Sequence, residues 1–455
     1  MNMKFDNIIK NIPDYKTFFT VEELDKSTEV LQKKYPEIVE VFKIGESREK
    51  HEINCIKIGN GRKVGLMFAC PHPNEPIGAM MLEYFTQALC ENESFRNELD
   101  YTWYIIKCVD PDGVKLNENW YKGPFNVTNY VKNFFRPAGD VQVEWSFPMH
   151  YKKYVFDKPL PETRALMSLI EDIKPDFVYS LHNAGFGGVF WYIGKEIPHI
   201  WDRLRDTTIE SGLPLHLGQP ELPCCKIYSD GIYEVTTGED IYDYLEEFSP
   251  IPAEKAYSRG TDSSSYASRF NNSVSLITEL PYFYDERIKN MNSCGRTKKD
   301  INIESVDINI AHYTKLDEVI KKFDKYIGND NQFILLVKEH IKDLESSAKA
   351  QKEWASQESF NVEATVAEMF DGLLISKFYA TLSTSMTLRA INFELNRTND
   401  DKERLDTLND AKKIVSSYLD EECKFLEKEL NYKVVPIRDL VKIQLESGLI
   451  VSQNI

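Results

Sequence analysis

The chain of 455 residues lacks long apolar runs. It contains no stretch of about 18 apolar residues, the length that a helix needs to cross a bilayer, and residues 1–7 do not have the apolar core of a signal peptide. Its eight cysteines show neither zinc-ribbon spacing nor a regular disulfide framework, and the adjacent pair Cys224 and Cys225 fits neither pattern. We therefore expect reduced thiols, a cytoplasmic location and no membrane partner.

Basic residues are also fewer than acidic residues. The sequence has 55 lysines and arginines against 72 aspartates and glutamates, which gives a formal net charge of −17 at pH 7. Proteins that bind nucleic acid rely on a high density of Lys and Arg to contact phosphates, so we expect no nucleic-acid partner. The solubility that a net charge confers is a sufficient reason for the acidic balance.

The chain does contain a pair of candidate metal ligands after an apolar run. The segment 68–76 reads FACPHPNEP and precedes a helix-like segment at 77–89. A buried strand that ends in His72 and Glu75 delivers an imidazole nitrogen and a carboxylate to one point, as a catalytic zinc ion requires. The spacing is less specific than a helical His-Glu-x-x-His motif, and a surface pair on a helical turn is the alternative interpretation.

A second histidine has the same context. His182 closes the strand-like run 176–181 (DFVYSL) and opens the flexible segment 183–188 (NAGFGG). Two strands that each release a ligand at the carboxyl end match the rule that open α/β sheets build their sites beyond those ends. A zinc hydrolase is therefore the first hypothesis. The alternative is that His182 is a hydrogen-bonded histidine near the core.

A third apolar run, 273–280 (SVSLITEL), carries Glu279 near its end. A half-buried carboxylate at this point could act as a general base, taking a proton from the attacking water and returning it to the leaving nitrogen. Considered alone, Glu279 is also explained by a salt bridge at the end of a strand.

Together these segments resemble the zinc carboxypeptidase family, the carboxypeptidase A-like metallopeptidases. The resemblance runs in order through about the first 300 residues and includes the approach to His182 at 161–166 (PETRAL). It implies an α/β fold with a mixed, mostly parallel sheet flanked by helices. It also implies one Zn²⁺ per chain on His72, Glu75 and His182, Glu279 as general base, and release of a C-terminal residue from a peptide.

The substrate-binding residues depart from the family pattern. The resemblance places the tyrosine that closes over the substrate at Tyr257, with Tyr266 as the competing assignment. Lys122 stands where an arginine that polarises the scissile carbonyl is expected, and the two side chains are not equivalent there. The Asn-Arg pair that grips a terminal carboxylate occurs only in altered form, as Asn133 and Arg136 separated by two phenylalanines.

These departures leave two other functions open. One is an amidohydrolase of the related deacylase type, which would act on an N-acyl amino acid or a cell-wall-like amide. The other is a non-catalytic zinc-binding module of the same fold, against which the intact ligands and Glu279 argue. The expected substrate is a peptide or an acyl amino acid. Thr261 and Ser263 lie on the loop where the family sets side-chain preference, and they suit neither a strongly basic nor an acidic residue.

The character of the sequence changes after about residue 300. Amphipathic or charged helical segments with few Gly or Pro are predicted at 316–327, 333–349, 360–395 and 402–430. We assign residues 1–329 to a catalytic domain and 330–455 to a helical C-terminal extension. Its apolar faces must pack on each other, on the catalytic domain or on a second subunit, which would give a homo-oligomer.

Overall fold

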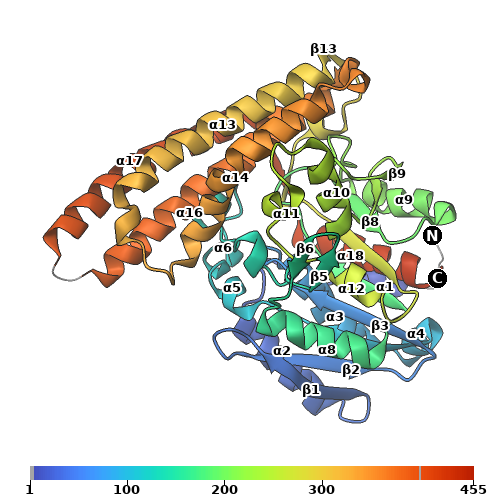
Figure 1. Cartoon of the computed structure of the whole chain (residues 1–455). Helices are drawn as coiled ribbons and strands as arrows, with labels where there is room; N and C mark the ends of the chain where they lie inside the picture. The colour runs from blue at the N-terminus through green and yellow to red at the C-terminus, as the bar shows by residue number, and fades with distance from the viewer. Residues whose placement is uncertain (1–4, 399–400) are drawn as a thin grey trace.

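An α/β unit and a helical bundle make up the molecule. The computed structural model describes residues 5–398 and 401–455, and the bundle extends to the upper left of the α/β unit in Figure 1. Within these described residues, no helix combines the length and the apolar character needed to cross a membrane. All eight cysteines lie in the described part of the chain, and each is a free thiol.

Nine strands form the main sheet of the described chain. Its centre, β4-β3-β7-β11, is parallel throughout, and antiparallel pairings join β2 to one side of this centre and β8 to the other. The predicted mixed sheet flanked by helices is therefore confirmed. In spatial order the strands are β1 (Val39–Glu46), β2 (Glu52–Ile58), β4 (Tyr101–Ile106), β3 (Lys63–Ala69), β7 (Phe177–Leu181), β11 (Val274–Glu279), β8 (Phe190–Ile193), β10 (Ile232–Glu234) and β9 (Ile227–Ser229).

Both faces of the central strands are buried. On β3, Met67 and Ala69 belong to the core cluster that includes α3 and α18, whereas Leu66 and Phe68 pack with α8 on the opposite face. Successive side chains of a strand point to opposite faces, so a strand covered on both sides is apolar at every position. This explains the continuous apolar runs in the sequence. The covering helices are α3 (Ile77–Glu91), α9 (Trp201–Ser211) and α18 (Ile437–Ser452) on one face, and α8 (Pro161–Ile173) and α12 (Ser263–Ala267) on the other.

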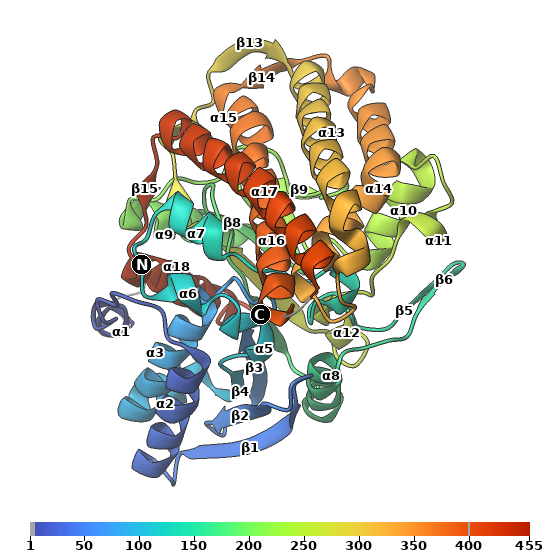
Figure 2. The ribbon, with the colours of Figure 1, turned by 90° about the vertical axis from the view of Figure 1, so that its left-hand side faces the viewer.

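Four long helices form the bundle. They are α13 (Lys298–Phe323), α14 (Gln332–Ala355), α16 (Ser376–Arg397) and α17 (Lys402–Glu429). Helix α13 packs on α14 and α17, and α16 packs on the same two helices; Figure 2 shows the four side by side. The predicted C-terminal helices are confirmed, although α13 starts 18 residues before the predicted residue 316 (316 − 298 = 18). It starts there because Thr297 accepts a hydrogen bond from the Asp300 N–H and caps the helix.

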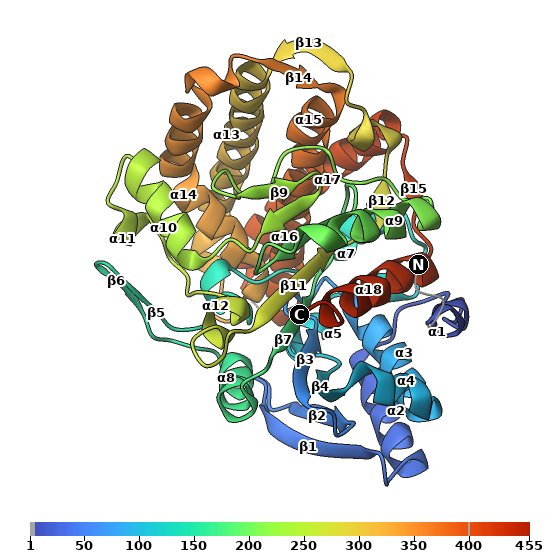
Figure 3. The same cartoon turned by 90° about the vertical axis from the view of Figure 1, so that its right-hand side faces the viewer.

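Short elements join the bundle to the sheet. Helix α15 and a π-helical turn lead into α16, β14 pairs with β13, and β15 pairs with β12 just before α18 returns to the sheet beside α3 and α9 (Figure 3). The division near residue 330 stays a prediction; α13 before it packs on the bundle, and α18 after it packs on the sheet. The joining elements are α15 (Val366–Phe370), the π-helical turn (Asp371–Ile375), β12 (Phe283–Tyr284), β13 (Ser293–Thr297), β14 (Glu363–Thr365) and β15 (Lys433–Val434).

The remaining α-helices and a short β-hairpin surround the main sheet. They are α1 (Asp6–Lys10), α2 (Val21–Lys34), α4 (Glu93–Leu99), α5 (Pro111–Lys115), α6 (Glu118–Tyr121), α7 (Val127–Asn133), α10 (Gly238–Phe248), α11 (Ala253–Ala256) and the hairpin of β5 (Met149–Tyr151) and β6 (Tyr154–Phe156).

Candidate metal centre

Three candidate residues converge because their strands are neighbours. β3, β7 and β11 are adjacent and parallel, and Leu181 at the end of β7 is in register with a residue of each neighbour. The carboxyl ends of the three strands therefore meet at one edge of the sheet. This edge releases His72, His182 and Glu279 into the same space.

His72, Glu75 and His182 form a compact set of ligands. One ligand atom from each residue lies within 4.8 Å of the others, and the residues are only 3%, 2% and 4% exposed. The Nδ1 atom of His72 is buried without a hydrogen-bond partner in the described chain. Burial, assisted by the Arg136 charge, lowers the pKa of His72 well below its ordinary value, which keeps the imidazole neutral. Two imidazoles and one carboxylate are a donor set of catalytic zinc sites, so these residues fit the ion.

A hydrogen-bond chain orients His182. Its Nε2 lies 2.8 Å from the Ser180 hydroxyl, which donates its own hydrogen to Glu144 Oε2 at 3.2 Å. The hydroxyl oxygen must therefore accept from Nε2–H, and Nδ1 is the nitrogen left free of a proton. That Nδ1 lies 3.1 Å from Glu75 Oε2. Partners of this kind fix the tautomer and the orientation of a metal-binding histidine.

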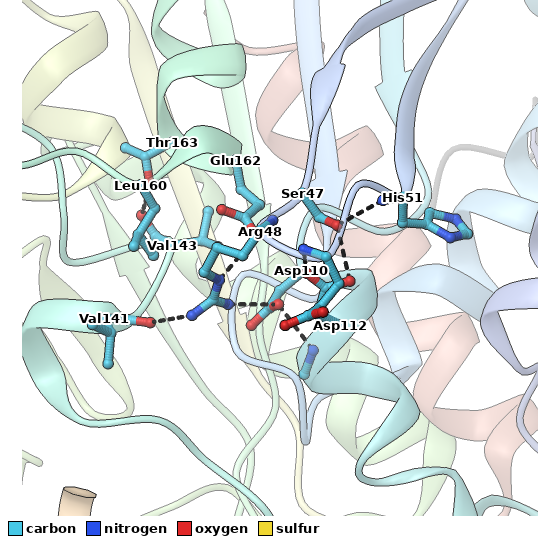
Figure 4. Close-up of polar contacts among 12 residues, drawn as sticks. Ser47, Arg48, His51, Asp110, Asp112, Val141, Val143, Leu160, Glu162 and Thr163 are labelled. Atoms are coloured by element: carbon cyan, nitrogen blue, oxygen red, sulfur yellow. Dashed lines mark hydrogen bonds and ion pairs between the residues drawn. The ribbon is translucent and has the colours of Figure 1, made fainter. Parts of the chain in front are cut away.

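Glu144 is itself held from two sides. Its other oxygen accepts from the Ser263 N–H and hydroxyl at 3.2 and 2.7 Å, and burial raises the pKa of Glu144 to about 7. The segment before it is fixed by the buried ion cluster of Figure 4. There the Arg48 guanidinium donates to Asp110, Glu162 and the carbonyl of Val141, at 3.0, 3.0 and 3.3 Å. The side chain that orients His182 is thus connected to the loop after β1.

The two ligand loops are tied directly to each other. The Asn183 N–H donates to Glu75 Oε2 at 3.2 Å, and Asn183 Oδ1 accepts from the Ile77 N–H at the start of α3 at 3.1 Å. A Cβ on Gly78 would stand 2.5 Å from the Leu181 Cβ, so glycine is required for α3 to begin this close to the ends of β3 and β7. Local packing therefore fixes the distance between the two loops.

Glu279 lies beside the ligand set without belonging to it. Its Oε1 is 3.9 Å from His182 Nδ1, and its Oε2 has no hydrogen-bond partner among the described residues. Burial raises the pKa of Glu279 well above its ordinary value, Glu221 and Glu75 raise it further, and Arg136 opposes them. A divalent cation bound nearby would lower this pKa again, because it stabilises the carboxylate.

A cavity of about 710 Å³ opens in front of these residues. The metal ligands and Glu279 line one end, and residues of α13, α14 and α16 line the other, so the bundle forms a wall of the site. Two contacts fix that wall. Glu339 of α14 accepts from the Gly139 N–H at 2.7 Å, and Arg389 of α16 donates to the carbonyls of residues 116, 133 and 134 at 2.7–2.8 Å.

The structure brings only one of the four predicted substrate-binding residues into this cavity. Arg136 lines it and forms an ion pair with Glu75 Oε1 at 3.0 Å. Lys122 instead donates to the Phe18 carbonyl and to Glu23 at the start of α2. The positions of Lys122, Asn133 and Tyr257 do not support a role for these residues in contacting substrate.

Asn133 and the two tyrosines have other partners. The Asn133 amide donates to Asn129 within α7. The Tyr257 hydroxyl is buried and donates to the Gly260 carbonyl at 2.7 Å, and the hydroxyl of Tyr266, the competing assignment, donates to Glu171 on the far face of the sheet. In each case the group that would have met substrate is already bound within the protein.

Three cavity residues were not predicted from the sequence. Arg259 lies 5.4 Å from the centre of the Trp145 ring and has no ion pair in the described chain. The Tyr379 hydroxyl of α16 accepts from the Gly185 N–H at 3.1 Å, directly over the loop that follows His182. Glu221, in the loop between α9 and β9, also lines the cavity, and its charge raises the pKa of Glu279. Only Arg259 had a sequence signal, because it lies two residues after Tyr257.

Known proteins support the family resemblance. Residues 24–198 match the model of the Zinc carboxypeptidase family, a segment that contains His72, Glu75 and His182 and ends before Glu279. The resemblance is thus confirmed for this part of the chain, which carries a zinc carboxypeptidase-family domain.

Three solved structures show remote similarity to this chain. Carboxypeptidase A from Helicoverpa armigera is 16% identical, with 58% of this chain and 65% of that chain covered and a TM-score of 0.37. A metallo-carboxypeptidase from Burkholderia cenocepacia is 15% identical, with 58% and 60% covered and a TM-score of 0.34. For murein-tripeptide amidase from Escherichia coli O157 the values are 18%, 53%, 83% and 0.26. The chain covers less than two thirds of the length of the two carboxypeptidases.

Proposed function

We propose that the protein is a zinc-dependent metallocarboxypeptidase that hydrolyses the C-terminal amide bond of peptides. The observation that carries this proposal is the buried set of His72, Glu75 and His182, with Glu279 Oε1 only 3.9 Å from His182 Nδ1. The cavity of about 710 Å³ in front of them has room for the end of a peptide. A site that had lost its activity would have no reason to retain three ligands and a base.

The chain's own residues divide the chemistry between them. Zinc held by His72, Glu75 and His182 would supply a Lewis acid that polarises the scissile carbonyl and lowers the pKa of a water. Glu279 takes the proton from the attacking water and returns it to the departing amine. Its buried position suits both steps, because burial brings the pKa of a carboxylate closer to neutral pH.

Two guanidinium groups in the cavity are available for a substrate carboxylate. Arg136 is already engaged with Glu75, whereas Arg259 lies over the Trp145 ring and has no ion pair among the described residues. We therefore assign the terminal carboxylate chiefly to Arg259, since a guanidinium binds a carboxylate with two parallel hydrogen bonds. A tyrosine phenol is protonated at neutral pH, so Tyr379 can donate to substrate while accepting from the Gly185 N–H. Tyr379 takes over the role first given to Tyr257.

The second candidate function is an amidohydrolase that acts on an N-acyl amino acid or a cell-wall-like amide. The engagement of Arg136 with Glu75 favours it, because the residue expected to hold a peptide's terminal carboxylate is partly neutralised. An N-acyl amino acid also carries a free carboxylate, which Arg259 could bind. The eight free cysteines agree with a reducing compartment, so we also keep the cytoplasm as the proposed location.

Zinc analysis and hydrolysis assays together separate the two functions. Purified protein should contain about one zinc per chain by elemental analysis, and His182→Ala should lose most of it. Peptides with a free C-terminus should be hydrolysed, whereas the same peptides with an amidated C-terminus should not. Turnover of acyl amino acids with poor cleavage of all peptides would establish the second function instead. Full zinc retention in both His72→Ala and His182→Ala would rule out this ligand set.

A further inference from the structure

The cavity in front of the metal ligands continues between three helices of the bundle. On α14 its lining is a stripe of residues at helical spacing, from Leu336 to Gln351. At 1.5 Å per residue this stripe is roughly 22 Å long, the length of about six residues of an extended peptide. Binding of a terminal carboxylate and of the scissile bond uses only part of that length.

Three side chains form a hydrogen-bonded layer across these helices. The Tyr313 hydroxyl of α13 lies 2.8 Å from His340 Nδ1 of α14 and 3.1 Å from the Ser383 hydroxyl of α16. All three residues line the cavity. The layer therefore marks one level of the cavity on all three helices.

Arg259, to which the terminal carboxylate is assigned, lies near this level. Ser258, directly before it, donates to Glu339 Oε1 at 3.4 Å, and Glu339 precedes His340 on α14. Burial, assisted by the Arg259 charge, lowers the pKa of His340 to about 4. The carboxylate end of a bound peptide would therefore lie beside Glu339 and His340.

The order of residues along α16 gives the direction of the rest of the substrate. Ser383 marks the level of Arg259, and Tyr379, about one turn earlier, accepts from the Gly185 N–H in the loop after β7. Ser376 lies nearly one turn further and also lines the cavity. A peptide with its carboxylate at Arg259 and its scissile bond at the metal ligands therefore continues toward Ser376.

Uncharged side chains line the cavity around Ser376. Asn309 Nδ2 donates to the Ser376 hydroxyl at 3.4 Å, and Gln351 Nε2 donates to the Ser347 hydroxyl at 3.3 Å. The side-chain oxygens of Asn309 and Gln351 accept no hydrogen bond in the described chain, so they can accept from a ligand. Serine and alanine leave room for a peptide backbone. We call Asn309, Ser347, Ala348, Gln351 and Ser376, which all line the cavity, the bundle subsite.

We propose that the bundle subsite binds the backbone of the peptide segment that precedes the scissile bond, so that peptides of about four residues or more are preferred to dipeptides and acyl amino acids. This inference rests on the proposed carboxypeptidase function and specifies the length of its substrates. Amide oxygens accept from backbone N–H groups and serine hydroxyls donate to backbone carbonyls, so binding depends little on substrate side chains. The bundle lies outside residues 24–198, the segment that matches the family model.

The kinetic test compares N-acetylated alanine peptides of two to six residues. The wild-type kcat/KM should rise by about 10- to 100-fold from the dipeptide to the pentapeptide, as two or three hydrogen bonds provide, and then level off. Ser347→Trp, which fills the subsite, should bring the pentapeptide-to-dipeptide ratio close to one, and Asn309→Ala should lower it about fivefold. Lys349→Trp, at an exposed position of α14 outside the cavity lining, should keep the wild-type ratio. If Ser347→Trp and Asn309→Ala lose activity equally on both peptides, with the ratio unchanged, the subsite is contradicted.

A binding measurement separates this inference from the proposed activity. In calorimetry with zinc-loaded protein, the acetylated pentapeptide amide should bind about tenfold or more tightly than the dipeptide amide, and Ser347→Trp should remove the difference. If no peptide is hydrolysed but this difference is present, the proposed activity fails and the subsite stands. If peptides of every length are hydrolysed with the same kcat/KM, the activity stands and the subsite is overturned. A length dependence that persists in Ser347→Trp overturns it as well.

Discussion

The carbonyl oxygen of His182 accepts a hydrogen bond from the side-chain amide of Gln444, with 3.1 Å between the two atoms. Gln444 lies on α18, more than 250 residues after the ligand (444 − 182 = 262). The same helix accepts from Trp191 through Ser447 at 2.9 Å. A helix far from the zinc carboxypeptidase-family match therefore supports the backbone of a proposed metal ligand.

Gln444→Ala should weaken zinc binding by roughly tenfold, the lower end of the effect seen when a partner of a metal ligand is removed. The substitution frees the His182 carbonyl and leaves a small void beside β7. Zinc affinity can be measured by competition with a chromogenic chelator. Gln453→Ala, at the exposed end of the same helix, is the matched control and should leave the affinity unchanged. An equal loss in both variants would indicate a general loosening of α18.

Glu279→Gln should retain zinc yet lose turnover by roughly three decades or more. The amide keeps the shape of the side chain but cannot take a proton, and Glu279 is not counted among the ligands. Zinc content and kcat should be measured on the same preparation. An active Glu279→Gln protein would show that another group is the base, and Glu75 cannot easily replace it while bound to metal.

Arg259→Ala should lower kcat/KM for substrates with a free carboxylate. The loss of transition-state binding free energy should be about 2–5 kcal/mol, as for the loss of a buried charge partner. Amidated substrates should be equally poor with both proteins. Arg136→Ala is the informative comparison. Because Arg136 pairs with Glu75, its removal should reduce zinc affinity as well as activity. A large loss of activity in Arg136→Ala with full zinc content would instead return the carboxylate to Arg136.

Stability should depend on pH through Glu446 of α18. Burial raises the pKa of Glu446 to about 7, and Glu210 and Asp6 raise it further, against Lys442. The folded pKa exceeds the unfolded value of 4.5, so the native state holds this proton more tightly. The free energy of unfolding should therefore fall as the pH rises from about 4.5 to about 7 and stay low above that range.

Glu446→Gln should accordingly be more stable than wild type by about 2 kcal/mol at pH 8, and the difference should shrink at pH 5. Urea unfolding at the two pH values measures it. Glu210→Gln, an exposed carboxylate next to it, should change stability by less than about 0.5 kcal/mol. A gap that is the same at both pH values would assign the effect to packing.

The ends of the central strands could be predicted from the sequence, because strands that are buried on both faces have continuous apolar sequences. Runs such as 64–68 and 176–181 are apolar at every position, and a polar residue at the end of such a run marks the edge of the sheet. His72, His182 and Glu279 are found in this way. Thr297, three residues before Asp300, is a helix-capping residue, so the start of α13 also has a signal in the sequence.

The cavity wall could not be predicted, because it depends on which elements pack against each other. The periodicity of residues 376–397 identifies a helix but not its neighbour, so nothing in the pattern places Tyr379 over the loop after His182. Glu221 lies in a loop without a recognisable motif. The family resemblance assigns Lys122 and Tyr257 by their order along the chain. The Lys122 side chain instead binds a segment distant in sequence, and the Tyr257 hydroxyl binds within its own turn.

The return of α18 to the sheet sets a time order for the synthesis of the protein. A ribosome makes β3, β7 and β11 long before it makes α18, and the His182 carbonyl has no Gln444 to bind until then. The unfinished chain also exposes the apolar face of β7 that α18 covers. We therefore expect nascent chains to bind zinc weakly and to need protection from aggregation until the helix has left the ribosome. Hydrolytic activity would then appear only after translation has passed residue 452.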